Sequence, residues 1–360
     1  MGVVERLERL AGALEATECV AYISAAPVDV RYFTGSEEPG GLLLYAPTHG
    51  AALVTRQSAA DHARDTVTGG VQVHAHGLDE DATALLAEIA HGWALRGGAA
   101  CGHLDTLALG ALTAGLPFLR PQAQPHLGPR LRRIKEPQEM AAIRQAATIA
   151  DAATAAAMAA IRVGATELEA AAALESVARM MGCEGNILQT QVKGGTRSAY
   201  PDALASPRRF QYGDIGYTDL AIFYKGYLGD LSRAFYIGEI ADDLRSLLSV
   251  VDTVQTLAKG LLRPGVSGRE LYLAVRDAFA EAGYPGFPPH HLGHGIGLAG
   301  ELPRLALDSE DVLQAGDVFT VEPGVYLPGL GGVRIEDVIV LHETGHEVLS
   351  RHPRVTAITT

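Results

Sequence analysis

Two short segments decide the fold of the C-terminal part of the chain: Tyr217-Thr218-Asp219-Leu220-Ala221-Ile222-Phe223 and Leu228-Gly229-Asp230-Leu231. Each carries one aspartate among apolar and aromatic residues, with the period of two that is typical of β-strands. A hairpin loop at residues 224–225 would place Asp219 directly opposite Asp230, whereas a loop at residues 225–226 would make them diagonal neighbours on one face. Either register brings the two carboxylates close together.

Two carboxylates held this close repel each other unless a proton or a cation lies between them. Two solvated hairpin acids are the simpler interpretation of such a pair. The apolar and aromatic residues around Asp219 and Asp230 instead favour burial, and two buried like charges require a counter-ion. We therefore predict a metal ion at this hairpin.

Further acids follow downstream. Glu322 ends the apolar run 318–321 and is stopped by a Pro-Gly pair, so it lies where a strand enters a site. We predict that residues 333–340 form one strand, with Arg334 and Glu336 on the same face. Arg334 either neutralises part of the acidic charge or binds an anionic group of a substrate, and a purely structural ion pair fits the pattern equally well.

Nitrogen ligands are available in His290-His291-Leu292-Gly293-His294-Gly295-Ile296-Gly297. A helical HExxH zinc site does not fit, because the glutamate is missing and glycines interrupt the segment. We interpret it as a glycine-rich strand or loop that lets one imidazole approach a metal. Residues 295–300 also match GxGxxG, but prolines on both sides remove the strand and helix that a dinucleotide site needs.

Composition limits the classes of function. A chain of 360 residues suggests two domains, and 29 basic against 42 acidic residues, a net charge of −13, disfavour nucleic acid or an anionic membrane as partner. The charged start does not fit a signal peptide, and no apolar run approaches the ~20 residues that span a bilayer, so we expect a cytoplasmic protein. Cys19, Cys101 and Cys183 are far apart and odd in number, which favours packing over disulfides.

Helical and strand-like segments alternate through about residue 115 and predict a small α/β domain. Four prolines then recur at every fourth residue: Pro117, Pro121, Pro125 and Pro129. No helix tolerates that spacing, so it predicts an extended linker. We place the N-terminal domain at 1–128 and the catalytic domain at 129–360, with a long Ala-rich helix over 136–161.

The second domain has a faint internal repeat. Residues 166–169 and 267–270 both have the spacing of a capping box, which starts a helix. Asp219 and Glu322 follow these two caps at nearly the same distance in sequence. Each half would thus supply a helix and then a pair of strands that carries acids.

Taken together, these segments resemble the creatinase, aminopeptidase P and prolidase family of metallopeptidases. The resemblance rests on Val30-Arg31-Tyr32-Phe33-Thr34-Gly35, Leu131-Arg132-Arg133-Ile134-Lys135, Gly213-Asp214, Gly226-Tyr227, Gly293-His294-Gly295-Ile296-Gly297, Val321-Glu322-Pro323-Gly324 and Arg334-Ile335-Glu336-Asp337. It implies an α+β fold, in which a pita-bread domain with a pseudo-twofold duplication follows a smaller α/β domain of the creatinase N-terminal kind. It also implies a homodimer, in which the first domain helps to close the substrate site.

The resemblance further implies that Asp219, Asp230, His294, Glu322 and Glu336 hold two divalent metal ions. Asp219 would chelate one ion, Asp230 and Glu336 would bridge both, and His294 and Glu322 would complete the second. Such oxygen-rich ligation favours Mn²⁺ over Zn²⁺ or Co²⁺. A metal-activated water would attack the peptide carbonyl, and Glu322 would carry a proton to the leaving nitrogen. The expected substrates are short peptides with proline on the leaving side, cleaved by an aminopeptidase or a dipeptidase.

Three positions depart from the usual pattern of these peptidases. Asp202 replaces a histidine that usually lies seventeen residues before the first aspartate, and Glu301 replaces one seven residues after the metal histidine. Arg56 stands where an aspartate is more usual. His290 is retained and is expected to assist catalysis from the outer shell of the metal site. We expect substrate to be bound by Asp202, Glu301, Arg334 and Arg56, the acids holding an α-amino group and the arginines a carboxylate.

Two other functions remain open. A different C–N hydrolase on the same fold, such as one that opens a cyclic amidine, would suit the altered histidines. A non-catalytic homologue that binds metal and uses the site as an interaction surface is the third possibility, although the complete ligand set argues against it.

Overall fold

The computed structural model describes residues 2–38 and 40–359, with the backbone alone at 185–189. The chain divides into two compact units between Arg132 and Arg133. We had expected the division after residue 128. The short helix α6 (Leu127–Arg132) belongs to the first unit, where the guanidinium of Arg132 forms a buried ion pair with the carboxylate of Asp29.

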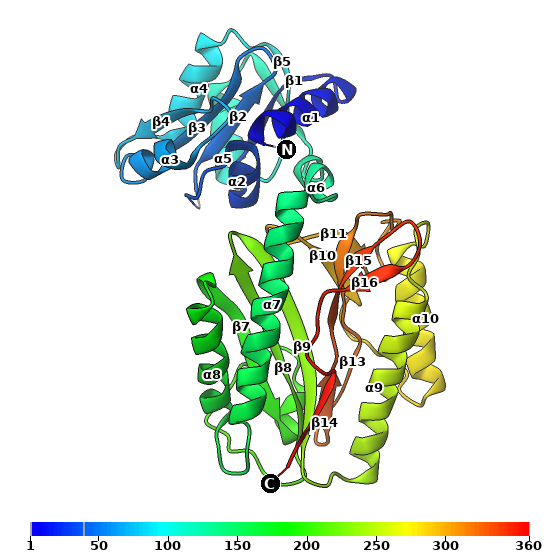
Figure 1. Cartoon of the computed structure of the whole chain (residues 1–360). Coiled ribbons are helices and arrows are strands. Elements are labelled where there is room, and N and C mark those ends of the chain that lie inside the picture. The colour runs from blue at the N-terminus through cyan, green and yellow to red at the C-terminus, as the bar shows by residue number, and fades with distance from the viewer. Residues whose placement is uncertain (1, 39, 360) are drawn as a thin grey trace. The chain divides into compact units, whose positions relative to one another are not determined.

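The N-terminal unit is built on one mixed sheet of six strands in the order β4-β3-β2-β1-β5-β6 (Figure 1). Its strands are β1 (Cys19–Ser24), β2 (Leu42–Ala46), β3 (Gly50–Arg56), β4 (Gln72–His76), β5 (Gly97–Cys101) and β6 (Leu119–Ala123). Its helices before α6 are α1 (Val3–Ala16), α2 (Pro27–Thr34), α3 (Ala60–Thr66), α4 (Ala82–Gly92) and α5 (Thr106–Gly115). Helix α1 forms because its apolar residues recur at helical spacing, and it buries Val3, Leu7, Leu10 and Leu14.

The proline-rich stretch is not an extended linker, so that prediction is wrong. Pro121 lies within β6, which pairs with β5 at the edge of the sheet. An edge strand accepts proline, because the outward-facing position has no strand that needs its N–H. Pro129 lies in the first turn of α6, where the backbone N–H groups have no helical partner.

The C-terminal unit has four helices, three sheets and a short 3₁₀ helix in its described residues. The helices are α7 (Pro137–Ala160), α8 (Glu167–Met180), α9 (Asp242–Gly260) and α10 (Gly268–Glu281), and the 3₁₀ helix is η1 (Gly195–Ala199). One sheet has the order β17-β9-β8-β7, from β7 (Glu184–Gly194), β8 (Ile215–Tyr224), β9 (Tyr227–Ile237) and β17 (Val355–Ile358). The second has the order β11-β10-β12-β15-β16, from β10 (Gly293–Ile296), β11 (Gly300–Leu305), β12 (Val318–Val321), β15 (Asp337–Leu341) and β16 (His346–Val348), and the third pairs β13 (Gly324–Leu327) with β14 (Gly331–Arg334).

The two halves of this unit repeat the same local geometry. Thr166 and Ser267 cap α8 and α10, and each side chain accepts a hydrogen bond from the backbone of the glutamate three residues later. Each cap residue also forms an isolated antiparallel bridge with a later segment, Thr166 with Arg209 and Ser267 with Val312. The internal repeat seen in the sequence is therefore a repeat in structure.

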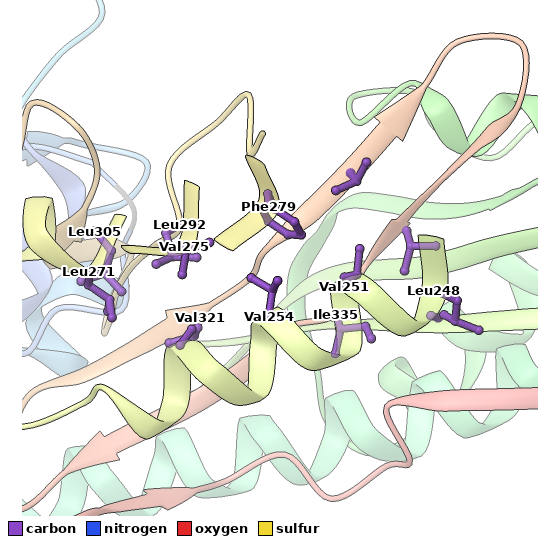
Figure 2. Packing of buried hydrophobic residues seen from close by; sticks show 14 of the residues in the cluster. Leu248, Val251, Val254, Leu271, Val275, Phe279, Leu292, Leu305, Val321 and Ile335 are labelled. Carbon is purple, nitrogen blue, oxygen red and sulfur yellow. The ribbon is translucent and has the colours of Figure 1, made fainter. Parts of the chain in front are cut away.

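Helices cover the sheets on the side away from the acidic residues. In the second half, α9 and α10 pack on the strands through a continuous apolar core (Figure 2). In the first half, the Ala-rich helix α7 lies so close to β9 that a Cβ at Gly229 would meet the backbone of Ala146 at 2.7 Å. Only glycine fits there, and the next residue along β9 is Asp230.

No helix within the described ranges has both the length and the apolar composition that a bilayer crossing requires.

Candidate metal centre

The β8–β9 hairpin presents its two aspartates on one face. Asp219 pairs with Ser232, and Ala221 pairs with Asp230, so the aspartates are diagonal neighbours. The loop is therefore at residues 225–226, the second of the two registers that the sequence allowed. Lys225 and Gly226 both have positive φ, 49° and 78°, as a tight hairpin turn requires.

The strand predicted over residues 333–340 is interrupted, so this expectation is wrong in part. Strand β14 ends at Arg334 and β15 begins at Asp337, because the chain passes from one sheet to another between them. At the crossing, the backbone N–H of Glu336 donates to the carbonyl of Ser232 at 3.0 Å, and the Ser232 hydroxyl donates to Glu336 Oε2 at 3.0 Å. Glu336 is thereby fixed beside the hairpin.

The five residues predicted as metal ligands come together in space. Carboxylate oxygens of Asp219, Asp230 and Glu336 lie within 4.8 Å of one another. His294 Nε2 lies 3.5 Å from Asp230 Oδ2 and 3.9 Å from Glu322 Oε1. Strands β8, β9 and β10, the residue that follows β12, and the β14–β15 crossing thus each contribute one donor.

Burial strongly affects the protonation of this cluster. It raises the pKa of Glu322 to about 7 and raises those of Asp219 and Glu336, although the charge of Arg334 partly offsets the effect. Burial alone would lower the pKa of His294, but its hydrogen bond to Asp230 and the nearby acid charges raise it to about 9. Four acids and one imidazole packed together in this way call for added positive charge.

This donor set fits divalent cations. Carboxylate oxygens together with one imidazole nitrogen are ligands that Mn²⁺, Zn²⁺ and Co²⁺ all accept. Cations among the acids would remove the like-charge repulsion that the buried cluster otherwise carries. The metal-binding roles of these residues stay a prediction, which the geometry supports.

Arg334 and Tyr326 connect the cluster to His290. Arg334 Nη1 donates to Asp219 Oδ2 at 2.6 Å, and its Nε donates to the Tyr326 hydroxyl at 2.7 Å. That hydroxyl lies 2.9 Å from His290 Nε2, while His290 Nδ1 lies 2.6 Å from the carbonyl of His291. A carbonyl only accepts, so Nδ1 carries the proton and Nε2 accepts from Tyr326. Burial lowers the pKa of His290 to about 3, so the ring is neutral.

Two residues near the site were not singled out in the sequence. His291 Nδ1 lies 3.4 Å from Glu322 Oε1, and with His290 these groups form a second cluster with metal-ligand character. The sequence could have indicated His291, because it is the neighbour of His290. Tyr326 has no such signal, because nothing in the local pattern of β13 marks its hydroxyl.

A cavity of about 400 Å³ opens over the cluster. Its lining includes four of the metal-ligand candidates together with Gln191, Pro201, Asp202, Pro289, His290, His291 and Arg334. Asp202 and Arg334 are therefore placed to meet a substrate. Glu301 is not among the lining residues, because it is buried in an ion pair with Lys135 Nζ at 3.2 Å. Arg56 is exposed at the end of β3 in the N-terminal unit.

Comparison with known proteins places the chain in a family. The model of metallopeptidase family M24 matches residues 141–343, more than half of the chain. The chain belongs to metallopeptidase family M24. The model of the creatinase/prolidase N-terminal domain matches residues 6–109. The expected fold class, an M24 pita-bread domain after a creatinase-type N-terminal domain, is confirmed, and membership of the family implies a divalent-metal site.

Individual relatives agree with this family. An Xaa-Pro dipeptidase from Bacillus anthracis has the same fold with a TM-score of 0.91, at 30% identity over the full length of both chains. An X-Pro aminopeptidase from Thermotoga maritima matches with a TM-score of 0.85 at 29% identity, over 99% of this chain and all of the other. The Xaa-Pro dipeptidase of Pyrococcus furiosus is 36% identical over 225 residues, which is 62% of this M24 chain and just under two thirds, 65%, of that relative.

Proposed function

We propose that this M24 chain is a metal-dependent peptidase that hydrolyses the Xaa-Pro bond of short peptides. The observation that carries the proposal is the buried cluster of Asp219, Asp230, His294, Glu322 and Glu336 at the base of a cavity. The relatives named as Xaa-Pro dipeptidases and an X-Pro aminopeptidase support the choice of bond. Two ions per chain, with Mn²⁺ preferred, is the loading that four carboxylates and one imidazole favour.

The protein's own residues have distinct roles in this reaction. Bound ions would polarise the scissile carbonyl and lower the pKa of the attacking water. Glu322 moves the proton to the leaving nitrogen, because its carboxylate lies in the cavity wall beside His294. Arg334 holds the Asp219 carboxylate in place through its 2.6 Å hydrogen bond. Neutral His290 fixes the Tyr326 hydroxyl, which in turn orients Arg334.

The cavity volume favours small substrates. About 400 Å³ is at the low end of the range for small-molecule sites, so a dipeptide or tripeptide fills it. Both a dipeptidase and an aminopeptidase are compatible with that volume. We also propose a homodimer, on the family resemblance alone, and sedimentation analysis would test it.

A metal-resolved screen of peptides tests the function. The chelator-treated protein, reloaded with Mn²⁺, Zn²⁺ or Co²⁺, would be given Ala-Pro, Ala-Pro-Ala and Ala-Ala. We expect chelator-sensitive cleavage of the Pro-containing peptides, with little cleavage of Ala-Ala. Cleavage of Ala-Pro alone identifies a dipeptidase, and release of alanine from the tripeptide an aminopeptidase. The Glu322→Gln variant is the inactive control. Bound metal without turnover of any peptide would contradict the proposal and favour a binding role.

A further inference from the structure

One wall of the cavity is a loop that follows η1, residues 200–206, which we call the wall segment. Asp202 lies on this segment, lines the cavity and is exposed. Within residues 2–38 and 40–359, no hydrogen bond or ion pair engages its carboxylate. The chain thus presents an acid without a protein partner to the space above the metal centre.

A buried lysine holds the start of the wall segment. Lys193, at 0% exposure on β7, donates from Nζ to Gln191 Oε1 at 2.6 Å, to the Tyr200 carbonyl at 2.8 Å and to the Pro201 carbonyl at 2.7 Å. These bonds use all three ammonium hydrogens. The ammonium also lies 4.5 Å from the ring centroid of Tyr217, which adds a cation–π contact. The backbone just before Asp202 is therefore fixed.

A buried acid holds the other end. Glu167, in the first turn of α8, accepts from the backbone N–H of Ser206 at 3.0 Å and from its hydroxyl at 2.6 Å. The same carboxylate accepts from Arg197 Nε at 3.0 Å, and Arg197 Nη2 donates to the Leu204 carbonyl at 2.8 Å. Because both ends are anchored to buried charged groups, the wall segment holds Asp202 in a set position.

The charges around the cavity show what Asp202 can receive. Arg334 is already engaged by Asp219 and Tyr326, and His290 is neutral. Two divalent ions would balance the four ligand carboxylates. Asp202 then faces the cavity without a hydrogen-bonded cation among the described residues, and Lys193 acts on it only through space. A preorganised acid of this kind binds a cationic group of the substrate. In a short Xaa-Pro peptide, the group that lies within one residue of the scissile carbonyl is the free α-ammonium.

We propose that Asp202 is a specificity-determining residue that receives the α-ammonium group of the substrate, and that Lys193 is the positioning residue that holds the wall segment for it. This inference rests on the proposed function. It adds to that function that the cavity selects the free N-terminus of the peptide.

The first test compares Ala-Pro with propionyl-Pro, which lacks only the amino group. The metal-loaded wild type should prefer Ala-Pro by roughly 10- to 100-fold in kcat/KM, the range for one charge-assisted hydrogen bond. Asp202→Asn should lose most of that preference through a higher KM for Ala-Pro. The matched control, Glu343→Gln, neutralises an exposed acid of the same unit and should keep the full preference.

A binding measurement separates this inference from the proposed function. Calorimetry with the alkene isostere of Ala-Pro, which has no amide to hydrolyse, and with its des-amino counterpart reports recognition without turnover. We expect the wild type to bind the amino form at least about 10-fold more tightly, and Asp202→Asn to bind both alike. If no Xaa-Pro peptide is cleaved but this difference persists, the proposed function fails and the recognition by Asp202 stands.

Lys193→Met and Lys193→Gln test the positioning role. Both remove the ammonium, and the amide of glutamine can still donate to one or two of the three acceptors. We expect both variants to reduce the preference for Ala-Pro over propionyl-Pro, methionine more than glutamine. Unchanged thermal stabilisation by Mn²⁺ would show that the metal centre is intact.

Equal cleavage of Ala-Pro and propionyl-Pro by the wild type would overturn the inference. A second outcome would also overturn it. If Asp202→Asn still required the amino group but lost a preference for Lys-Pro over Ala-Pro, Asp202 would bind a basic side chain of the substrate instead.

Discussion

Arg334 donates a 2.6 Å hydrogen bond to Asp219 while the Tyr326 hydroxyl holds its Nε at 2.7 Å, so one guanidinium sets the position of a carboxylate in the acidic cluster. Lysine keeps the charge but offers a single nitrogen, which cannot satisfy both partners at these separations. We expect Arg334→Lys to reduce kcat/KM or metal affinity by about 10- to 100-fold, as for other residues that orient metal ligands. Activity assays and metal titrations measure this, with the exposed Arg144→Lys as control. Wild-type values for Arg334→Lys would show that the charge alone matters.

Neutralising Glu336 should abolish metal binding without lowering the stability of the metal-free protein. Burial, followed by the charges of Asp230, Glu322 and Asp219, raises its pKa well above the usual value. Glu336→Gln resembles the protonated side chain, so we expect the metal-free variant to be at least as stable as the metal-free wild type. The rise in Tm on adding Mn²⁺ should be lost. Thermal unfolding with and without chelator measures both, and a retained rise would remove Glu336 from the ligand set.

In the metal-free protein, Glu322 and His294 should contribute less stability as pH rises. The pKa of Glu322 is raised to about 7 and that of His294 to about 9, so the folded chain holds protons that the unfolded chain has released. By linkage, these protons contribute to the free energy of unfolding at low pH. That contribution is lost as pH rises through the pKa values of the folded chain. His290 and His291, with pKa values lowered by burial to about 3 and about 4, oppose this only below their usual pKa of 6.5.

Above neutral pH these two histidines no longer oppose the effect, but Lys193 does, because burial lowers its pKa to about 7 and the folded chain then releases a proton that the unfolded chain keeps. Between pH 7 and pH 9 we expect the Tm of the chelated wild type to fall relative to that of chelated His294→Gln, which lacks the group with the raised pKa. The Mn²⁺-loaded protein should change less, because the ligands are already deprotonated. The same change of Tm with pH in chelated wild type and chelated His294→Gln would contradict the assignment.

The hairpin turn should be sensitive to side-chain volume at Gly226, whose φ is 78°. A β-branched residue is strained there, so Gly226→Val should lower the free energy of unfolding by about 1–2 kcal/mol. Gly260→Ala is the matched control, since Gly260 lies at the end of α9 with nothing within 4 Å of an added Cβ. It should be neutral or slightly stabilising. Denaturant unfolding measures both, and equal effects would mean that the turn has another conformation.

The Lys135–Glu301 ion pair should matter for stability more than for substrate binding. Their side chains are 1% and 2% exposed, and neutralising Glu301 leaves the Lys135 ammonium buried without the charge that it pairs with. Glu301→Gln should therefore cost up to about 3–5 kcal/mol of unfolding free energy, and Lys135→Met with Glu301→Leu should recover part of it. Peptide KM values of folded Glu301→Gln should stay near wild type. A large KM change would restore the substrate-binding role expected from the sequence.

The sequence predicted the elements that have a strong local period. Helix α1 and the hairpin strands were expected because their apolar residues recur at helical or strand spacing. The sequence did not determine the hairpin register, since two loops fitted the alternation. The pairing of Tyr224 with Tyr227 and the positive φ of Gly226 distinguish them. The proline spacing led to a wrong prediction. A proline is tolerated in a strand at the edge of a sheet, and sequence alone does not show which strand lies at an edge.

At the candidate site, the four acids and the one histidine were predicted because the family motifs carry them. Arg334 was expected to neutralise part of the acidic charge, but the sequence did not show that Asp219 is the acid it binds. The pairing of Lys135 with Glu301 was not expected, because the two are far apart in sequence and meet only through tertiary packing. Tyr326 was missed for the same reason. A hydroxyl in an apolar strand gives no signal until its neighbours are known.

The structural repeat of the C-terminal unit has a consequence for how the acidic cluster is assembled. Asp219 and Asp230 come from the first half, and Glu322 and Glu336 from the second. A single half would hold only two acids and would need a second copy of itself to complete the set, so its metal affinity would depend on protein concentration. Covalent linkage of the halves replaces that encounter with a high effective concentration. The joined chain can therefore keep its metal centre at any dilution.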